Sequence, residues 1–537
     1  MLGPQLSLVV FNAVLLTLLI CPLVLWRYRR AVLAGMQART GVGLAPDAPL
    51  APHAPHTVAA AARGGDVAAA LDWERRVHRR AIAAVLGVTF VCALPLSALF
   101  VLLNDLPHTP LHLSLKAAAL AALAVPMAAV LIALPPRRAL LRFVVTLLAL
   151  GAATVVLSVL QRLTQGRAPS ADQALNFVLF MQLAGVTLWL PLALLLASGA
   201  RRVRGVAPIV LAGVLVFALG PLLGMQLTQW LTESRTGARW VLSGPGLDTG
   251  FVLLALPMGW LAWWRLKSLA RAYEAKRFSD AQLLLRTWWA LVVAVEVVEL
   301  VNAHAQATVL LLLVGVAASA LFATLLAVSL RRALALPGRP APRTLLVLRV
   351  FGDSARSEAL FDRLVARWRW FGPVTLIAAP DVVARTVDPG DFLRFASGDV
   401  SASFVHDAAE LQQRLATLDL QPDPDGRFRI NEFCCADDTW QATVVQLIER
   451  ADAVVMDLRG FGAQRQGCAF ELAELRARCP APQVLLLVDG STDRALLEPL
   501  RGSGAARLPL LELRQQRGAA FERACDQAFV RLWQTAA

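Results

Sequence analysis

Three acidic residues follow three apolar runs near the C-terminal end of the chain, where a parallel sheet would bring them to one edge. Asp353 comes shortly after TLLVLRV, Asp457 ends AVVMD, and Asp489 ends QVLLLVD. In an open sheet of alternating strands and helices, ligands bind outside the carboxyl ends of the strands. We therefore expect the three carboxylates to share a ligand-binding rim, although each one alone is also an ordinary loop or helix-capping residue.

A cysteine and a glutamate three residues apart form a second candidate group. The segment GCAFELAEL predicts a helix after the strand that ends at Asp457, with Cys468 and Glu471 on one face. A carboxylate there could stabilise the oxocarbenium-like charge on a ribose as its base leaves, as carboxylates do in glycoside cleavage. The alternatives are that Glu471 and Glu474 lie in solvent and pair with nearby arginines, and that Cys468 is a small buried packing residue.

Two further carboxylates lie within an apolar segment. Glu296 and Glu299 are three residues apart and share one face of a predicted membrane helix. Carboxylates at that depth usually face a bundle interior or water, and Lys116 on another predicted span is a candidate counter-ion. The pair indicates a ligand, ion or proton site, unless this helix lies at the membrane interface with both carboxylates exposed.

Apolar runs of membrane-spanning length recur along the first 332 residues. The chain of 537 residues is 57% hydrophobic with a mean hydropathy of +0.58, which predicts a polytopic α-helical membrane domain over residues 1–332. The nine predicted spans lie near residues 5–26, 81–103, 113–134, 143–161, 176–198, 206–226, 249–264, 287–303 and 306–330. Because no basic region precedes the first run, we expect it to remain as a span.

Arginine clusters flank alternate ends of these runs and explain the formal net charge of +14. They lie in the segments 27–30, 75–80, 137–142, 201–204, 265–277 and 331–332. The positive-inside rule then predicts a multi-pass protein of a bacterial inner membrane, with its N-terminus outside and its C-terminus in the cytoplasm. The expected partner of these basic residues is the lipid bilayer, not nucleic acid. Residues 31–72 are rich in Ala, Pro and Gly, and predict a flexible cytoplasmic loop.

The hydrophobic period changes after a Pro- and Gly-containing linker at 333–343. Residues 344–537 alternate buried strands with amphipathic helices, which predicts a cytoplasmic α/β domain that folds alone around a parallel sheet of flavodoxin-like order 2-1-3-4-5. Residues 380–437 are long for a connection and are expected to form a helix and a short hairpin or loop. Asp438 is the expected N-cap of the helix that follows.

The segment RGFGAQRQGCAFELAEL resembles the TIR-like domains. In that family the helix carries W-C-x-x-E, whose glutamate is catalytic in the members that cleave NAD. Cys468 and Glu471 match C-x-x-E, while Gly467 stands in place of the tryptophan. The order of elements over residues 344–537 also agrees, and a group of uncharacterised bacterial multi-pass proteins looks similar there. The resemblance implies NAD as substrate rather than bound cofactor, Glu471 and Asp457 as catalytic residues, and a ligand contact by Cys468.

Several site types are excluded because the residues that they require are missing. The tail from Thr344 onward contains no lysine, which excludes a P-loop and a standard phosphoacceptor receiver. No G-x-G-x-x-G follows a predicted strand, and Cys434 and Cys435 are adjacent rather than at C-x-x-C spacing, so neither a dinucleotide fingerprint nor a zinc or other metal site is expected.

Three functions remain open on the sequence. The first is a membrane-anchored signalling or effector protein, which could assemble as a homo-oligomer and whose TIR-like domain binds or cleaves a nucleotide such as NAD. The second is a non-catalytic interaction module tethered to the membrane. The third is a transporter or channel with a regulatory cytoplasmic domain, which only Glu296 and Glu299 favour.

Overall fold

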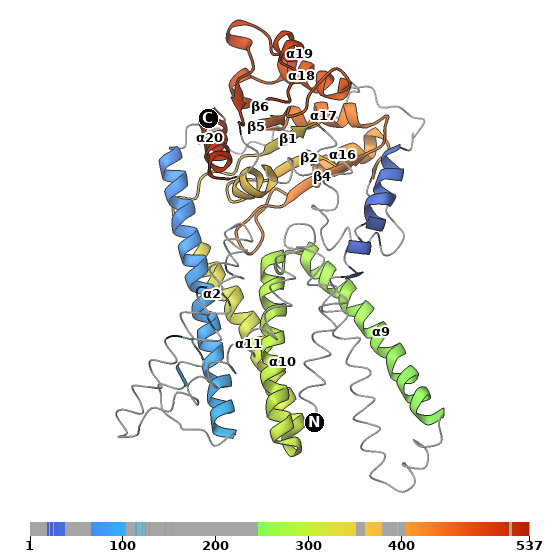
Figure 1. Cartoon of the computed structure of the whole chain (residues 1–537), viewed down its shortest axis with the longest axis vertical. Coiled ribbons are helices and arrows are strands. Elements are labelled where there is room, and N and C mark those ends of the chain that lie inside the picture. The colour runs from blue at the N-terminus through green and yellow to red at the C-terminus, as the bar shows by residue number, and fades with distance from the viewer. Residues whose placement is uncertain are drawn as a thin grey trace. The chain divides into compact units, whose positions relative to one another are not determined.

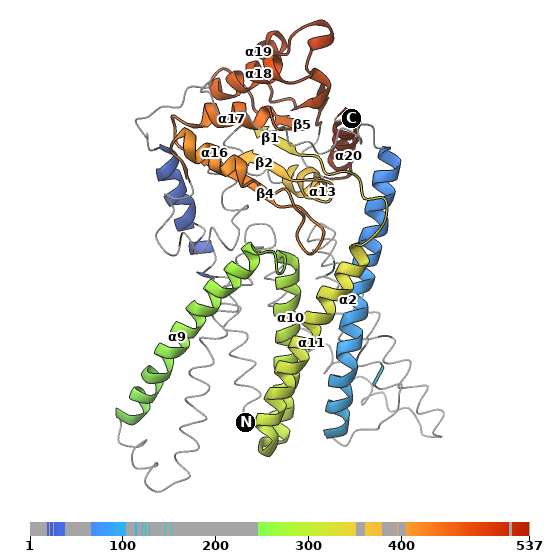
Figure 2. The ribbon, with the colours of Figure 1, turned by 180° about the vertical axis from the view of Figure 1, so that it is seen from behind.

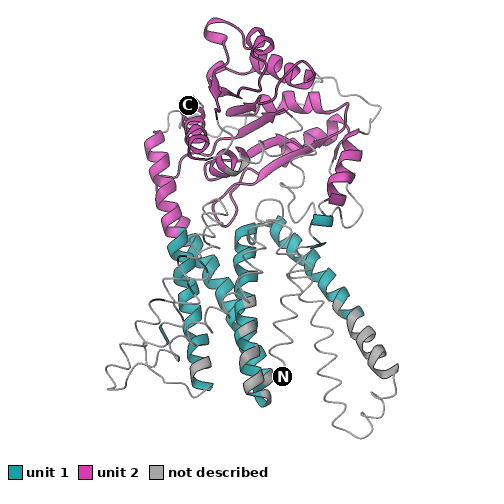
Figure 3. Cartoon of the chain, viewed as in Figure 1, with its two compact units in different colours: residues 1–24, 81–331, 388–393 teal, residues 25–80, 332–387, 394–537 magenta. Residues whose placement is uncertain are grey.

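The fold was determined from a computed structural model of the chain (Figure 1). The residues that it describes are 19–20, 22–24, 26–37, 66–103, 245–350, 360–378, 395, 404–514 and 518–535, with isolated positions between 113 and 152. The chain divides into two compact units (Figure 3). The first comprises Met1–Val24, Ala81–Arg331 and Asp388–Leu393, and the second comprises Leu25–Arg80, Arg332–Val387 and Arg394–Ala537.

Four long helices account for most of the described part of the first unit. They are α2 (Val67–Leu103), α9 (Pro245–Glu274), α10 (Asp280–Ala303) and α11 (Thr308–Leu334). By length and composition, two helices in the described residues are long and apolar enough to cross a membrane, over Val67–Leu99 and Val309–Leu334. The predicted spans near 176–198 and 206–226 lie outside the described residues, as do most positions of those near 5–26, 113–134 and 143–161.

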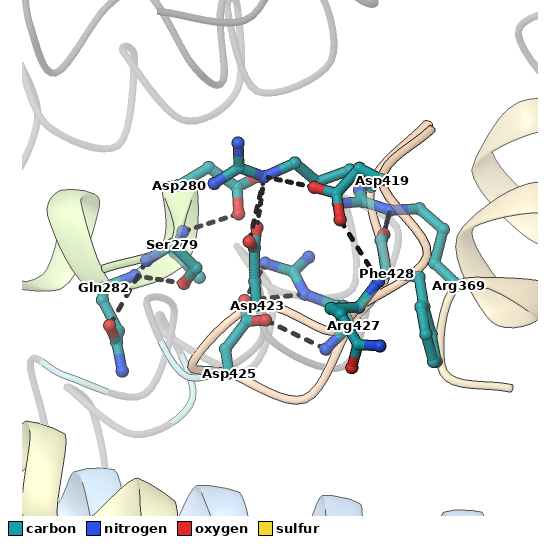
Figure 4. A network of polar contacts seen from close by, with 12 residues as sticks. Ser279, Asp280, Gln282, Arg369, Asp419, Asp423, Asp425, Arg427 and Phe428 are labelled. Carbon is teal, nitrogen blue, oxygen red and sulfur yellow. Dashed lines mark hydrogen bonds and ion pairs between the residues drawn. The ribbon is translucent and has the colours of Figure 1, made fainter. Parts of the chain in front are cut away.

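Local sequence chemistry sets where α10 begins. Ser279 is its N-cap: the Ser279 hydroxyl accepts from the Gln282 backbone N–H at 3.2 Å, and the Gln282 side chain accepts from the Ser279 N–H at 3.3 Å (Figure 4). Because this capping box satisfies two N–H groups that have no partner within the helix, α10 starts at Asp280, seven residues before the predicted span.

The second unit is built on a seven-stranded sheet in the order β3-β4-β2-β1-β5-β6-β7, and every neighbouring pair is parallel. The strands are β1 (Leu345–Arg349), β2 (Val374–Ile377), β3 (Phe404–Val405), β4 (Ile430–Cys435), β5 (Ala453–Asp457), β6 (Val484–Val488) and β7 (Leu510–Glu512). The expected order 2-1-3-4-5 is confirmed as β2-β1-β5-β6-β7. Strands buried on both faces read as continuous Leu and Val runs, which is why the sequence shows them clearly.

The insertion at residues 380–437 contributes a helix and two strands to the α/β unit. It contains the expected helix, α16 (Ala408–Ala416), but it also adds β3 and β4 as two further parallel strands beyond β2. A tight turn precedes β4, where Gly426 has a φ of +82° and the backbone bonds Asp423 N–H to Arg427 O and Gly426 N–H to Asp423 O are both 2.8 Å. Arg427 also donates to Asp425 within this turn, at 2.9 Å from Nε (Figure 4).

Helices cover both faces of the sheet (Figures 1 and 2). Alternate strand residues enter two cores, since successive side chains of a strand point to opposite faces. One core receives α16, α17 (Trp440–Ile448), α18 (Gln466–Arg478) and α19 (Arg494–Leu500), and the other receives the π-turn η3 (Phe361–Val365), α13 (Ala366–Trp368) and α20 (Ala519–Thr535). The N-cap of α17 is Thr439 and not the expected Asp438. The Thr439 side chain makes no capping hydrogen bond, and its hydroxyl instead donates to Val405 O at 2.8 Å.

The first turns of α2 belong to the α/β unit. Trp73, which is 2% exposed, packs with Ala70 and Val77 into the core beneath α13 and α20, and its ring lies 5.9 Å from that of Phe371. Residues 26–37 are helical and also fall in this unit. The α/β unit therefore includes chain between the first two predicted spans, and its core contains Trp73 in addition to side chains of residues 344–537.

Candidate functional site

The candidate site lies at the carboxyl ends of β1 and β5. The chain runs from β1 to β2 on one side of β1, and it later returns to place β5 on the other side. This reversal is the topological switch point at which open α/β sheets bind ligands. Arg349 at the end of β1 is the register partner of Asp457 at the end of β5, so a basic and an acidic residue occupy neighbouring positions at this edge.

Asp457 is held by a buried arginine two residues further along the chain. Arg459 donates from Nε to Asp457 Oδ1 at 2.8 Å and from Nη2 to Asp457 Oδ2 at 2.6 Å, and both residues are less than 5% exposed. Burial alone would lower the pKa of Arg459, but its hydrogen bonds to Asp457 and the charges of Asp457 and Asp489 raise it. Since both carboxylate oxygens are engaged, Asp457 primarily orders the end of β5.

Asp489 orders the loop that follows β6. Its Oδ1 accepts from the Ser491 backbone N–H at 2.9 Å, and its own N–H donates to the Thr492 hydroxyl at 3.1 Å. The Thr492 hydroxyl in turn donates to Leu458 O at 2.9 Å, which ties this loop to the end of β5. Asp489 thus has the loop-capping contacts that the sequence offered as the alternative to ligand binding. Asp353 lies outside the described residues.

Glu471 on α18 is the unusual acid of this region. It is 3% exposed, and its Oε2 is buried with no hydrogen-bond partner among the described residues. Burial raises the pKa of Glu471 to about 8, although the charge of Arg349 opposes that rise. The alternative that Glu471 and Glu474 both lie in solvent and pair with arginines is therefore wrong for Glu471, which is buried. It holds for Glu474, whose side chain accepts from Arg478 Nε at 2.7 Å.

The Cys468 thiol lies one turn before Glu471 and is 6% exposed. Burial raises its pKa to about 12, and the neighbouring charge of Glu471 acts in the same direction. Because the thiolate is the nucleophilic form, a thiol with this pKa is inert near neutral pH. Cys468 is accordingly a packing residue of the core between α17 and α18, which agrees with the alternative given for it.

Gly467, which replaces the tryptophan of the TIR-like motif, lies beneath an indole from the adjacent helix. A Cβ at Gly467 would lie 3.5 Å from the ring of Trp440 on α17, and Trp440 contacts Phe470 edge to face with ring centroids 5.5 Å apart. The space beside Gly467 is therefore filled by an aromatic residue that comes from another part of the sequence.

Sequence reasoning missed the two arginines of the site. Arg349 and Arg459 are each 3% exposed, and both stand at or just after a strand end. The signal was available, because an arginine within a buried apolar strand such as LLVLR requires a partner to offset its desolvation. The pairing of Arg459 with Asp457 depends on the turn after β5, which the sequence does not specify.

Glu296 and Glu299 are not part of this site, because they belong to the other compact unit. Both belong to α10 in the first unit, where Glu296 is half-buried. The side chain of Glu299 and the whole of Lys116 lie outside what the structure describes. Within the described ranges, no group of three or more His, Cys, Asp or Glu residues could hold a metal ion.

Comparison with known proteins found no matching family model, no matching curated protein and no matching solved structure.

Proposed function

We propose that the α/β unit is the nucleotide-binding domain of a membrane-anchored signalling or effector protein, and that the ligand is a ribonucleotide such as NAD. The observation that carries this proposal is Glu471: a buried carboxyl group with an unpartnered oxygen, near Arg349 at the switch point of a parallel sheet. A strongly perturbed acid at a ligand-binding edge is a functional-site candidate, since structural acids are normally paired.

The protonation of Glu471 suggests two successive roles. With a pKa of about 8, the resting side chain is a carboxylic acid that can donate a hydrogen bond to a ribose hydroxyl. A ligand with a cationic nicotinamide ring would favour the carboxylate, which would then stabilise the positive charge that develops at the ribose C1′. As the glycosidic bond breaks, its electron pair leaves with the nicotinamide nitrogen, and water adds to C1′ with loss of a proton.

Membrane attachment is the second part of the proposal. Its support is the two helices that are long and apolar enough to span, α2 and α11, together with the arginine clusters beside the apolar runs. The proposed arrangement is multi-pass in a bacterial inner membrane, with the N-terminus outside and the C-terminus in the cytoplasm. A homo-oligomer would bring several nucleotide-binding units together.

The test uses the full-length protein in lipid vesicles with NAD, because the core of the α/β unit includes Trp73, which lies between the first two predicted spans. Nicotinamide release and NAD binding are both measured. Glu471→Gln should abolish release, since the amide keeps the shape and loses the charge, while the matched change Glu474→Gln should leave release unchanged. Unchanged release in Glu471→Gln would overturn the catalytic role, and a wild type that neither binds nor cleaves NAD would overturn the choice of ligand.

The non-catalytic interaction module is a second candidate, favoured by one observation. Asp457 is fully engaged by Arg459, so the rim offers fewer unpaired carboxylates than the sequence predicted. In that case Glu471 would remain a neutral core residue, and Glu471→Gln would change neither the fold nor partner recruitment.

A further inference from the structure

One face of α9, in the first unit, carries large apolar side chains that are exposed. The exposed fractions are 69% for Leu256, 69% for Trp260, 36% for Trp263 and 45% for Trp264. These positions are separated by three and four residues or adjacent, so they form a single stripe along the helix. Tryptophan is costly to leave in water, and three such side chains on one stripe indicate a surface that is covered by something else.

Basic side chains continue the same stripe toward the end of α9. Lys267 and Arg271 follow at the same helical spacing and are exposed, as is Arg265 beside Trp264. Lys267 Nζ lies 5.0 Å from the centre of the Trp263 ring, and Arg265 Cζ lies 5.2 Å from that of Trp264. Within the described residues no acidic side chain forms an ion pair with any of these three cations.

The opposite face of α9 is the one that packs against protein. Ala262, Ala270 and Tyr273 are buried, and Tyr273 joins Phe278 and Leu283 in a small core against which Leu266 and Leu269 also pack. The exposed stripe consequently points away from this contact within the first unit.

We propose that the α9 stripe, which consists of Leu256, Trp260, Trp263, Trp264, Lys267 and Arg271, binds anionic phospholipid at the boundary between the membrane and water. The chemistry changes in order along the helix, from aliphatic to indole to cationic, over about 22 Å at 1.5 Å per residue. Indole rings prefer the headgroup level, and lysine and arginine extend their charges to lipid phosphates. This inference rests on the proposed membrane location.

The order of residues distinguishes a lipid surface from a protein partner. A lipid monolayer presents hydrocarbon, then a mixed interface, then phosphate, which is the same sequence of environments that the stripe displays. Within the stripe, the cation–π contact of Lys267 holds this cation beside the Trp263 ring, so the positive charge directly follows the indoles along the helix.

The experiment uses the full-length protein in vesicles of phosphatidylcholine, with or without phosphatidylglycerol. Flotation measures membrane insertion, and native mass spectrometry of the re-extracted protein measures the bound phosphatidylglycerol. The variant Lys267→Gln with Arg271→Gln should insert normally and bind phosphatidylglycerol more weakly by about fivefold for each charge removed. The matched control, Arg514→Gln with Arg523→Gln, removes two exposed charges from the α/β unit and should bind as the wild type does.

Three results would overturn the inference. They are wild-type retention of the two lipids in equal amounts, an unchanged affinity in the α9 variant, and an equal loss in the control. A wild type that does not float with vesicles would instead remove the proposed membrane location, and the lipid site with it. That result is distinguishable, because loss of the lipid site alone leaves flotation unchanged.

Discussion

Arg367 Nη2 lies 2.5 Å from Glu74 Oε2, so the helix that follows β1 is ion-paired with the first turns of α2. Both side chains are largely buried, with exposed fractions of 19% and 9%. Arg367 also contacts Asp526 of α20 at 2.8 Å, and Arg363 binds the same carboxylate at 3.0 Å. One network of ion pairs within the α/β unit therefore joins the first turns of α2 to the segment after β1 and to α20.

Replacing Glu74 with glutamine should destabilise the α/β unit. The amide removes the charge that offsets the buried Arg367 guanidinium, which would retain Asp526 as its anionic partner among the described residues. We expect a loss of about 1–3 kcal/mol, measured by denaturant unfolding of the full-length protein in detergent.

Asp72→Asn is the control for this variant. Asp72 is on the same helix and pairs with Arg75 and Arg76, but all three side chains are about half exposed or more. Exposed pairs contribute little, so the stability should be nearly unchanged. If both variants lost the same unfolding free energy, the buried ion pair of Glu74 with Arg367 would contribute no more to stability than an exposed pair.

Replacing Trp73 with alanine should cost more. Trp73 fills a fully enclosed position among the aromatic residues of α13 and α20, and removal of a buried aromatic ring costs about 3–5 kcal/mol. Thermal unfolding of the full-length protein checks this value. Trp26→Ala, at a residue 54% exposed in the same unit, should change stability by less than about 1 kcal/mol. Two equal effects would mean that α2 is not part of the core.

The buried Glu471 should make stability depend on pH. Its pKa is raised from the ordinary 4.5 to about 8, so the folded chain holds this proton more tightly than the unfolded chain. The Glu471 contribution to stability is therefore fully present below the unfolded pKa and is lost as the pH rises through about 8. Glutamine does not titrate, so the melting temperature of Glu471→Gln relative to the wild type should increase across this window.

The measurement is a series of melting curves for both proteins between about pH 5 and pH 9. Glu474→Gln is the comparison, since Glu474 is paired with Arg478 on the same helix and should show no such increase. A constant difference between Glu471→Gln and the wild type at every pH would argue that Glu471 is ionised in the folded chain.

The strand order around β1 was predictable, and the additional strands were not. Runs such as LLVLR and VLLLV are apolar throughout, and parallel strands covered on both faces produce that pattern by themselves. The segment of β4, INEFCC, mixes polar and apolar residues because its first half is only partly buried. Its pairing with β2 is decided by long-range contacts, which no local pattern encodes.

In the candidate site, the residue types were predictable from the sequence, and their roles were not. Residue types and spacing alone identified Asp457 and Asp489 as acids at strand ends, because a change of hydrophobic period marks where a strand stops, and placed Glu471 on the helix that follows β5. Only the tertiary structure decided their roles: the turn after β5 brings Arg459 onto Asp457, and the packing of α18 buries Glu471. Burial and pairing depend on residues far apart in the chain, so the protonation of a carboxyl group cannot be read from its neighbours in sequence.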